Sequence, residues 1–404
     1  MSGSTSVSGV PPAGSVHDER EIDAVVELMR TTSLAIGAKV AEFEERMAAL
    51  LAKRFGVMVN SGSSALRLAI DLIGCEPGDE IITPPVTFST DIAPMVQSDI
   101  VPVFVDVEPD TFQIDPLGIE AMIGPRTKAI LAPNLVGNCP DWDAIRAIAD
   151  TSDLVVVEDS CDVVDSWLRG ERTGTRADIS VTSFALSHAL TAGGNGGMVA
   201  LNDSELRDRC LSLRRWGRLS EHYLFGSKKG GQDRFGALAD GTSYDLVFTF
   251  DEIGYNFEPT EISAAIGLVQ LEKLPNFNAQ RRHNWMMLDE FFAGYDDRVV
   301  RPRTTDGCDT TWMRYCFLLG EEGGLDRTEV QEFLEFRGVP TRMVWTGNVL
   351  RQPGFEGIPH RAPAGGLPNA DEVMDRGLTL PIHHGMNSDH VGFMIDQLGE
   401  LLAE

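Results

Sequence analysis

The sequence predicts an α/β fold, with a large α/β/α domain around a mostly parallel sheet and a smaller C-terminal α+β domain. Three observations support this prediction: a length of 404 residues, short apolar runs that alternate with segments of helical spacing, and polar residues that follow these runs. A chain of this length exceeds what one hydrophobic core usually supports, so two lobes are expected. Strands and helices in regular alternation are typical of a parallel sheet covered on both faces.

The predicted elements follow a simple order along the chain. Residues 19–55 carry apolar side chains at helical spacing and predict helices. Strands are then predicted at VMVN, DEIITPP, VPVFVDV, KAILAPN, LVVVED, ISVTSFA and GGMVAL. Residues 203–250 begin as a helix and continue as a polar, glycine-rich loop, and a long helical segment then crosses into the second lobe. We expect a flexible tail at residues 1–16, a large domain at 17–275 and a small C-terminal domain at 276–404.

Composition and charge exclude several classes of protein. Hydrophobic residues make up 43% of the chain and charged residues 24%, which is typical of a globular protein. The net charge of -27 argues against binding to nucleic acid or to anionic membranes, because both need a cationic surface. No apolar run is long enough to span a bilayer, and the first residues do not form a signal segment, so we expect a cytoplasmic protein. The six cysteines form no CxxC pair, which favours reduced thiols, and no metal site is expected.

Polar and aromatic residues follow the ends of the predicted strands, where ligands of parallel sheets bind. NSGSSALRLAI contains a turn, Gly62, Ser63 and Ser64, whose free N–H groups suit a phosphate, although serine and glycine serve equally well as helix caps. Asp159 ends the strand VVVED, where a carboxylate can pair with a protonated ring nitrogen, cap a helix or bind a metal. Phe88, in PPVTFST, can stack on a flat ring or pack in the core.

The stretch TSFALSHALTAGGNGGMVAL is the most informative part of the sequence. Ser183 ends a predicted strand, His188 follows in a loop, and a glycine cluster precedes the next strand. Glycines permit a close approach of the backbone to a ligand. A histidine in a loop is by default a surface or capping residue, so its neighbours decide the interpretation.

Five blocks of sequence together resemble the DegT/DnrJ/StrS sugar aminotransferase family, a fold-type I pyridoxal-phosphate group. The blocks are NSGSSAL, the TF of PPVTFST, VVVEDSCD, the SF and GG around the histidine loop, and GYNFEPTEISAAIGLVQLEKL; they span roughly residues 20–275, and TLPIHHGM matches more loosely. The resemblance implies a fold-type I transferase fold. It also implies pyridoxal 5′-phosphate or pyridoxamine 5′-phosphate as the cofactor, and a homodimer with shared active sites.

The resemblance implies a role for each matching residue. Asp159 is expected to hold the pyridine nitrogen protonated, which keeps the ring an electron sink. Phe88 is expected to stack on the ring, and Asp162 falls where many relatives carry a glutamine near the ring hydroxyl. Asn256 is expected to reach the phosphate of a neighbouring subunit. The residues expected to bind the phosphate within one subunit are Gly62, Ser63, Ser64 and Ser183.

His188 stands where ordinary members carry a lysine, five residues after Ser183. A lysine amine forms a Schiff base with the cofactor, which imidazole cannot do. The branch with histidine here consists of 3-dehydratases of nucleotide-linked 4-keto-6-deoxy sugars, and VEDSCD, RRWGR and TRMVWTGNVLRQPGF resemble its motifs. The resemblance implies that His188 is the general base, which removes a proton from the methylene carbon of pyridoxamine phosphate before hydroxide leaves C3 of the sugar.

The loop after His188 departs from the family pattern. One extra residue stands before Gly196 and Gly197, and a different placement of this gap would put Ser187 at the lysine position. None of the six lysines lies in the loop, which leaves Lys228 and Lys229 as the candidates for a displaced replacement.

Two further expectations concern the cofactor and the substrate. RRWGRLSEHYLFGSKKGGQDRF contains no cysteine, and an iron–sulfur cluster normally needs four thiolates. We therefore predict no iron–sulfur cluster, and an amino acid, usually glutamate, as the amine donor. Plausible contacts with a nucleotide-linked keto sugar are Arg215, Trp216, Arg342, Asn348, Arg351 and His383. The alternative for the arginines is a surface position, and for His383 a place in a turn.

Three functions therefore remain open from the sequence. The favoured one is C3-dehydration of a nucleotide-diphosphate 4-keto-6-deoxy sugar, in deoxysugar, natural-product or polysaccharide biosynthesis. The second is an aminotransferase that acts on a sugar or a cyclitol-like substrate with an atypical active site. The third is a catalytically silent binding or regulatory protein, against which the retained Asp159, Phe88 and Ser183 argue.

Overall fold

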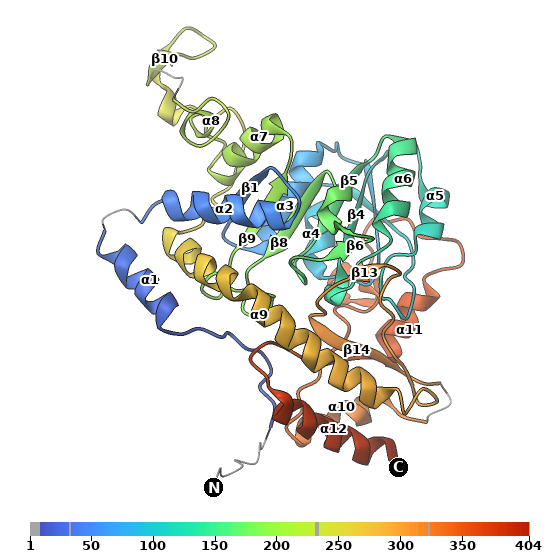
Figure 1. Ribbon diagram of the computed structural model, residues 1–404. Coiled ribbons are helices and arrows are strands. Elements are labelled where there is room, and N and C mark those ends of the chain that lie inside the picture. Colours follow the sequence, from blue (N-terminus) through green and yellow to red (C-terminus); the bar gives the residue numbers. More distant parts are fainter. Residues whose placement is uncertain (1–8, 32–33, 231–233, 322–323, 404) are drawn as a thin grey trace.

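The computed structural model describes residues 9–31, 34–230, 234–321 and 324–403. A large lobe surrounds a central sheet, and a smaller C-terminal lobe packs below it in the view of Figure 1. This arrangement confirms the predicted α/β fold with a mostly parallel sheet.

The central sheet has seven strands in the order β1-β9-β8-β5-β4-β2-β3. Strands β8, β5, β4, β2 and β3 are parallel to one another, whereas β9 is antiparallel to both of its neighbours. Their bounds are β1 Phe55–Val59, β2 Glu80–Thr83, β3 Val101–Phe104, β4 Thr127–Pro133, β5 Val155–Asp159, β8 Ile179–Ser183 and β9 Gly197–Leu201.

Both faces of the sheet are buried because each strand is apolar at successive positions. In β5, Val156 packs into one hydrophobic cluster with Trp142 of α6, and Val157 packs into another with Leu68 of α3. Alternate side chains of a strand point to opposite faces, so a continuous run of valines needs helices on both sides. The helices of this lobe are α1 Glu19–Met29, α2 Ala38–Leu50, α3 Gly62–Ile73, α4 Ser89–Gln97, α5 Ile119–Met122, α6 Trp142–Ser152, α7 Ser204–Arg214 and α8 Glu221–Leu224.

Helix α9, Glu261–Phe292, connects the two lobes without a break (Figure 1). Thr260 caps its first turn, and its N-terminal half packs against α2 and α1 of the large lobe. Its C-terminal end enters the core of the small lobe, where Phe292 stacks on Tyr315 with ring centroids 5.2 Å apart. The boundary predicted after residue 275 therefore falls inside a helix that both lobes share, and the domain limits stay a prediction.

The small lobe combines an antiparallel sheet with three helices of its own. Strand β14 lies in the middle, paired with β12 on one side and β15 on the other. The elements are β12 Val299–Val300, β14 Arg314–Leu319, β15 Gly377–Pro381, α10 Arg327–Phe336, α11 Pro368–Arg376 and α12 Ser388–Ala403. One hydrophobic cluster joins this lobe to side chains of the large lobe, including Phe104 and Leu135.

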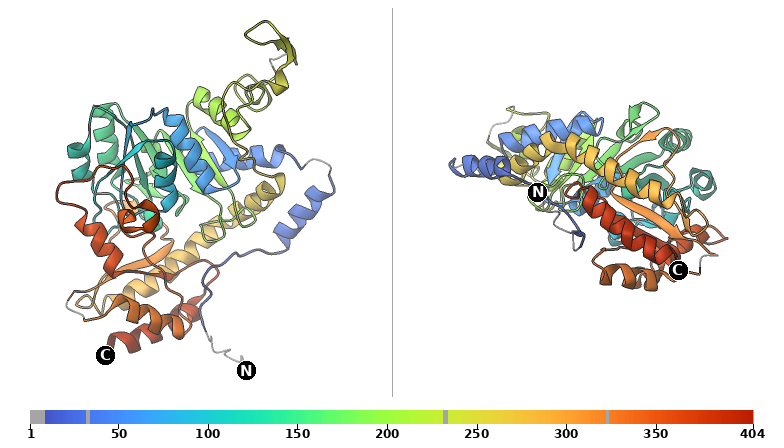
Figure 2. Two further views of the ribbon diagram at one scale, coloured as in Figure 1. Left: turned by 180° about the vertical axis from the view of Figure 1, so that it is seen from behind. Right: turned by 60° about the horizontal axis from the view of Figure 1, so that its bottom comes forward.

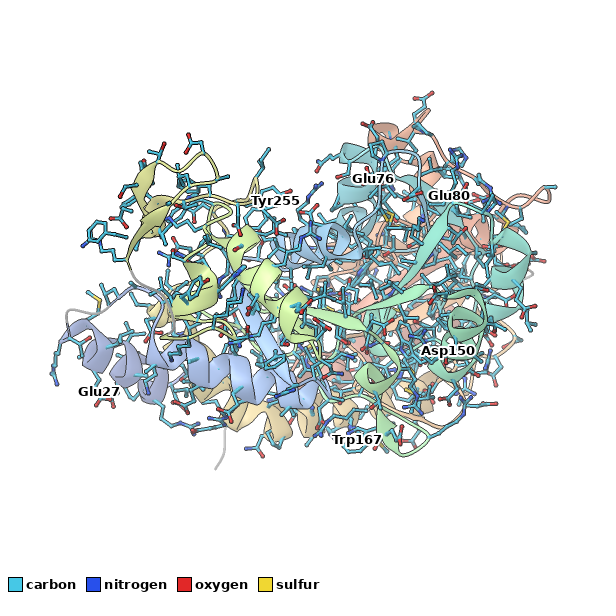
Figure 3. The ribbon with its side chains drawn as sticks, turned by 90° about the horizontal axis from the view of Figure 1, so that it is seen from above. Glu27, Glu76, Glu80, Asp150, Trp167 and Tyr255 are labelled. Atoms are coloured by element: carbon cyan, nitrogen blue, oxygen red, sulfur yellow. The ribbon has the colours of Figure 1, made fainter. Side chains whose placement is uncertain are left out.

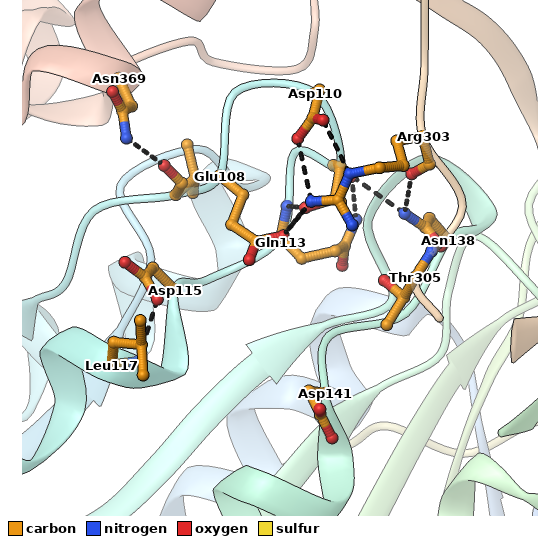
Figure 4. A network of polar contacts seen from close by, with 12 residues as sticks. Glu108, Asp110, Gln113, Asp115, Leu117, Asn138, Asp141, Arg303, Thr305 and Asn369 are labelled. Atoms are coloured by element: carbon orange, nitrogen blue, oxygen red, sulfur yellow. Dashed lines mark hydrogen bonds and ion pairs between the residues drawn. The ribbon is translucent and has the colours of Figure 1, made fainter. Parts of the chain in front are cut away.

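Polar contacts also fix the small lobe against the large one. Arg303 donates to Asp110 at 2.7 Å and to Glu108 at 3.0 Å, while Asn138 donates to the Arg303 carbonyl oxygen at 3.1 Å (Figure 4). A few residues further on, β13, Cys308–Asp309, pairs with β6, Trp167–Leu168, which forms a hairpin with β7, Glu171–Arg172. These contacts lie next to the ends of β4 and β5, so the lobes meet at the edge of the sheet where ligands are expected.

Two regions differ from the sequence predictions. Part of the predicted flexible tail, residues 1–8, lies outside the described residues, but Val10 is buried and its N–H donates to the Gly338 carbonyl oxygen at 2.9 Å. An apolar side chain of the predicted tail thus packs on the small lobe, and the extent of the flexible tail stays a prediction. The glycine-rich loop contains a hairpin, β10 Phe235–Ala237 with β11 Ser243–Asp245, in an arm that projects from the large lobe (Figures 1 and 2).

No helix within the described residues combines the length and the apolar character needed to cross a membrane.

Phe292→Ala tests the role of α9 in the core of the small lobe. Removing a fully buried ring should lower the free energy of unfolding by about 3–5 kcal/mol, measured by urea denaturation. Phe336→Ala is the matched control, because that ring is 92% exposed and its removal should change stability by less than about 0.5 kcal/mol. Equal effects of the two substitutions would contradict the proposed packing.

Candidate functional site

The predicted site residues gather where β1, β8 and β5 end. Val59, the last residue of β1, pairs with Gly197, and so does Ser183 at the end of β8. Asp159 ends β5, beside β8 in the sheet. Sheet pairing therefore brings together side chains from three segments that are far apart in the sequence.

Gly62 forms the base of a cradle for an anion. A Cβ at this position would lie 2.7 Å from Ser183 Cβ and 3.3 Å from Cys161 Sγ, so a larger side chain has no room. Ser61 caps α3 by accepting a hydrogen bond from the Ser64 N–H at 3.1 Å. The first turn of a long helix thus lies against the Ser183 side chain, and its N–H groups and dipole favour a negative ligand.

The serines predicted to bind a phosphate differ in how free they are. Ser63 is exposed, and its neighbour Ser64 is buried with Oγ donating to Asn60 Oδ1 at 2.7 Å. Ser183 is buried, and its Oγ accepts a weak hydrogen bond from the Ala185 N–H at 3.3 Å. Ser63 and Ser183 are therefore the hydroxyls that are most available to a ligand.

Asp159 is a buried residue at the end of β5. Its side chain is 5% exposed, and Oδ1 accepts a hydrogen bond from the Cys161 N–H at 2.9 Å. Burial raises the pKa of the Asp159 carboxyl above its usual value. A cationic partner would reverse this shift, so the group is suited to hold a protonated ring nitrogen.

His188 lies in the loop after β8. Its side chain is 16% exposed, and its Nδ1 lies 3.8 Å from Asp162 Oδ1. Within the described residues Nδ1 is buried and makes no hydrogen bond. Burial, helped by the positive charge of Arg281, lowers the pKa of His188 to about 4. The imidazole is therefore neutral near pH 7 and able to accept a proton.

Asp162 lies between the His188 loop and the turn after β4. Its Oδ2 accepts a hydrogen bond from the Val136 N–H at 2.8 Å. Burial raises the pKa of Asp162 well above its usual range, and the nearby Asp159 raises it further, whereas Arg281 and Arg314 lower it. The carboxyl thus has one acidic and two basic neighbours.

Sequence reasoning missed two arginines behind the site, the buried Arg281 and the half-buried Arg314. Arg281, on α9, donates to the carbonyl oxygens of His188 at 3.0 Å and Met313 at 3.1 Å, and to His384 Nδ1 at 3.3 Å. Arg314, at the start of β14, donates to Thr379 Oγ1 at 2.6 Å. Burial lowers the pKa of both guanidinium groups to about 10. A signal existed for Arg281, because it falls on the apolar face of its helix between Phe277 and Leu288.

Phe88 is the aromatic residue best placed to cover a flat ligand. It is the N-cap residue of α4 and is 53% exposed, which is unusual for a phenylalanine. The small lobe packs next to it: Thr346 Oγ1 donates to the Thr87 carbonyl oxygen at 2.7 Å, and Asn348 forms a bridge with Val86. An exposed ring here fits stacking and excludes the core position left open by the sequence.

The structure places the predicted substrate contacts in different surroundings. Asn348 and Arg351 both bind Asp371, at 2.9 Å and 3.3 Å. Arg342 is 62% exposed in its side chain and lies close to Glu335. His383 Nε2 lies 2.8 Å from the Pro11 carbonyl oxygen, so the N-terminal segment occupies one side of this ring.

Arg215, Trp216 and Asn256 lie together at the base of the projecting arm. Arg215 pairs with Glu221 at 3.0 Å and forms a backbone bridge with the exposed Asn256. The Trp216 N–H donates to the Tyr255 carbonyl oxygen at 2.6 Å, and Tyr255 lies where the arm joins the large lobe (Figure 3). No hydrogen bond in the described part of the chain connects these three predicted residues to the His188 loop.

All six lysines lie in the described ranges, and none of them hydrogen-bonds to the His188 loop. Lys53 donates to the carbonyl oxygens of Gly174 and Ala177, and Lys273 pairs with Glu21 at 2.7 Å. Lys228 lies over the ring of Tyr223, in the projecting arm together with Lys229.

Across the residues that the structure describes, no group of three or more histidine, cysteine or acidic side chains could hold a metal ion. Cys139 and Cys308 form a close pair of free thiols, with their sulfur atoms 3.2 Å apart.

Comparisons with known proteins agree with this geometry. The model of the DegT/DnrJ/EryC1/StrS aminotransferase family matches residues 15–399. The chain is 35% identical to a dTDP-4-dehydro-2,6-dideoxy-D-glucose 3-dehydratase of Saccharopolyspora spinosa, over all of this chain and 88% of that protein. It is 31% identical to a GDP-perosamine synthase of Caulobacter vibrioides, over 96% of each chain. A solved structure of E. coli GDP-4-keto-6-deoxy-D-mannose-3-dehydratase with bound hydrated PLP superposes with a TM-score of 0.86 at 27% identity, over 96% of this chain and 98% of the other.

Gly62→Ala tests the cradle. The added methyl group would lie too close to Ser183, so affinity for pyridoxal phosphate, measured by absorbance titration, should fall about tenfold or more. Gly392→Ala is the control, because this glycine lies inside α12 with no atom within 4 Å of a new Cβ. The control should bind the cofactor normally, and unchanged binding by Gly62→Ala would contradict the assignment.

Proposed function

The chain belongs to the DegT/DnrJ/EryC1/StrS aminotransferase family, and we propose that it removes the C3 hydroxyl from a nucleotide-diphosphate 4-keto-6-deoxy sugar with pyridoxamine phosphate as cofactor. The observation that carries this proposal is His188. A neutral, largely buried imidazole stands at the position of the family's lysine, and no lysine in the described part of the chain hydrogen-bonds to its loop. A histidine can move a proton there, but it cannot hold the cofactor covalently.

The residues of the site fit the cofactor. Gly62 and Ser183 shape a cradle for the phosphate at the start of α3, Asp159 offers a buried carboxyl to the ring nitrogen, and Phe88 presents a free ring for stacking. When bound, pyridoxamine phosphate supplies an amine that condenses with the C4 ketone and a ring that accepts electrons. Asp162 is the residue that would lie near the ring hydroxyl.

His188 is the proposed general base. Because its Nδ1 is enclosed and faces Asp162, the ring can reach a substrate only through its other edge. Arg281 holds the backbone of the loop through the His188 carbonyl oxygen, which fixes where the imidazole stands. Once His188 has taken the proton, Asp162 is the nearest group that can stabilise its positive charge.

The proposed substrate contacts differ in which existing partners they must release before they can bind the substrate. Arg342 is largely exposed but pairs with Glu335 at 3.6 Å, so a phosphate would have to replace this carboxylate. Arg351 and Asn348 must first exchange Asp371 for the sugar nucleotide, and His383 must release Pro11. Arg215 and Trp216 are proposed to flank the nucleotide from the base of the arm.

We also propose a homodimer in which the arm contacts a second copy. The arm and its base expose Phe235, Phe248, Phe250 and Ile253 to 67%, 51%, 53% and 97%. Apolar patches of this kind usually mark an interface. Asn256 is exposed beside them, as expected of a residue that reaches the phosphate of the neighbouring subunit. We propose glutamate as the amine donor, and we expect the enzyme to act in the cytoplasm in deoxysugar biosynthesis.

Product analysis tests the proposed reaction. The holoenzyme with glutamate should convert a GDP- or dTDP-linked 4-keto-6-deoxy sugar into the 3-deoxy-4-keto sugar, with release of 2-oxoglutarate and ammonia. In this balance, glutamate supplies the two electrons that replace C–OH by C–H. A stable amino sugar as the product would instead indicate an aminotransferase. No turnover across such a panel, despite bound cofactor, would indicate a binding protein.

His188→Lys tests the role of the histidine. Borohydride treatment of the wild-type protein with pyridoxal phosphate should label no lysine, whereas the variant should be labelled at position 188 and should lose dehydration. His188→Asn is the matched control, which should bind the cofactor reversibly, stay unlabelled and be inactive. A label on Lys228 or Lys229 in the wild-type protein would contradict the mechanism.

A further inference from the structure

Asp91 is a buried carboxyl group next to Asp159 to which the proposed function gives no role. It lies in the first turn of α4 and is fully buried. One oxygen, Oδ2, accepts a hydrogen bond from Thr87 Oγ1. The other, Oδ1, is enclosed and has no hydrogen-bond partner in the described residues. Asp159 is the acid whose charge acts most strongly on Asp91, and each of these two carboxyl groups shifts the pKa of the other.

Two buried carboxyl groups that interact in this way cannot both be ionised at low cost. Neither Asp91 nor Asp159 takes part in an ion pair among the described residues. Asp162, the third acid nearby, adds to the repulsion. Burial and the charge of Asp159 raise the pKa of Asp91 well above its usual range. A proton on Asp91 removes the repulsion and gives the enclosed Oδ1 a partner.

We propose that Asp91 is a positioning residue of the cofactor site, which stays protonated and donates a hydrogen bond to Asp159. This inference rests on the proposed binding of pyridoxamine or pyridoxal phosphate. The bond stabilises Asp159 as a carboxylate and, together with the Cys161 N–H, fixes its orientation. Asp159 is therefore already ionised when the ring nitrogen binds, and it keeps that nitrogen protonated.

A simpler explanation is that Asp91 only stabilises the start of α4. An ionised carboxylate in the first turn interacts favourably with the helix dipole. That role needs a charged Asp91, whereas the positioning role needs a neutral one. The protonation state of Asp91 therefore separates the two explanations.

Infrared spectroscopy of the holoenzyme at neutral pH, with ¹³C-labelled aspartate, tests the protonation state. The difference between the wild-type protein and Asp91→Asn should contain one lost carbonyl band of a protonated carboxylic acid. Asp389→Asn, an exposed residue in the first turn of α12, should lose only a carboxylate band. Loss of a carboxylate band alone in Asp91→Asn would overturn the proposal.

The protonation state of the cofactor's ring nitrogen tests whether Asp91 keeps Asp159 ionised. With ring-¹⁵N pyridoxal phosphate, Asp91→Asn should keep the ring nitrogen protonated, because the amide N–H still donates to Asp159. Asp91→Leu should move the ¹⁵N signal toward the unprotonated position and raise the Kd for the cofactor about tenfold. A folded Asp91→Leu protein with wild-type values for both would overturn the proposal. If that variant does not fold, the infrared result decides.

Neither measurement requires turnover, so its outcome is independent of the reaction that the enzyme catalyses. An inactive protein with the expected bands and ¹⁵N signal would contradict the proposed dehydration and leave the role of Asp91 intact.

Discussion

The buried guanidinium group of Arg281 is the interaction on which the site depends most. It is 2% exposed and donates to acceptors from three segments: the loop after β8, the residue before β14 and the turn after β15. An arginine can be buried in this way only if its donors are satisfied. Because these acceptors belong to both lobes, the position of His188 is coupled to the docking of the small lobe.

The position of Arg281 also affects the other ionisable groups of the site. Arg281 and Arg314 bring positive charge to the rear of the site, where Asp162 would otherwise stand unopposed. Asp91, Asp159 and Asp162 are three buried acidic residues that interact with one another. Their burial favours protons over charges. The position of each ionisable group therefore determines the protonation of the next, and the site behaves as one coupled unit.

Sequence reasoning recovered the parts of the molecule that depend on local pattern. Valine-rich runs such as 155–157 predicted strands, and the residues that follow them, Asp159 and Ser183, lie at the expected edge of the sheet. Residues whose role depends on burial were missed. Asp91 reads as an ordinary acidic residue in a helix start, and only the fold places it against Asp159. The hairpin of the arm was missed because its strands are three residues long and rich in polar neighbours.

The charge balance of the site explains why a neutral base suits it. With a proton on Asp91, the Asp159 carboxylate can pair with the ring nitrogen, and Asp162 is balanced by the two arginines. The proposed phosphate position is at the start of α3, where the helix dipole favours a negative charge. A permanent cation at position 188 would add a positive charge beside Arg281, which is one reason that the pKa of His188 is low. A histidine that is cationic only while it holds the transferred proton, with Asp162 3.8 Å away, avoids this cost in the resting enzyme.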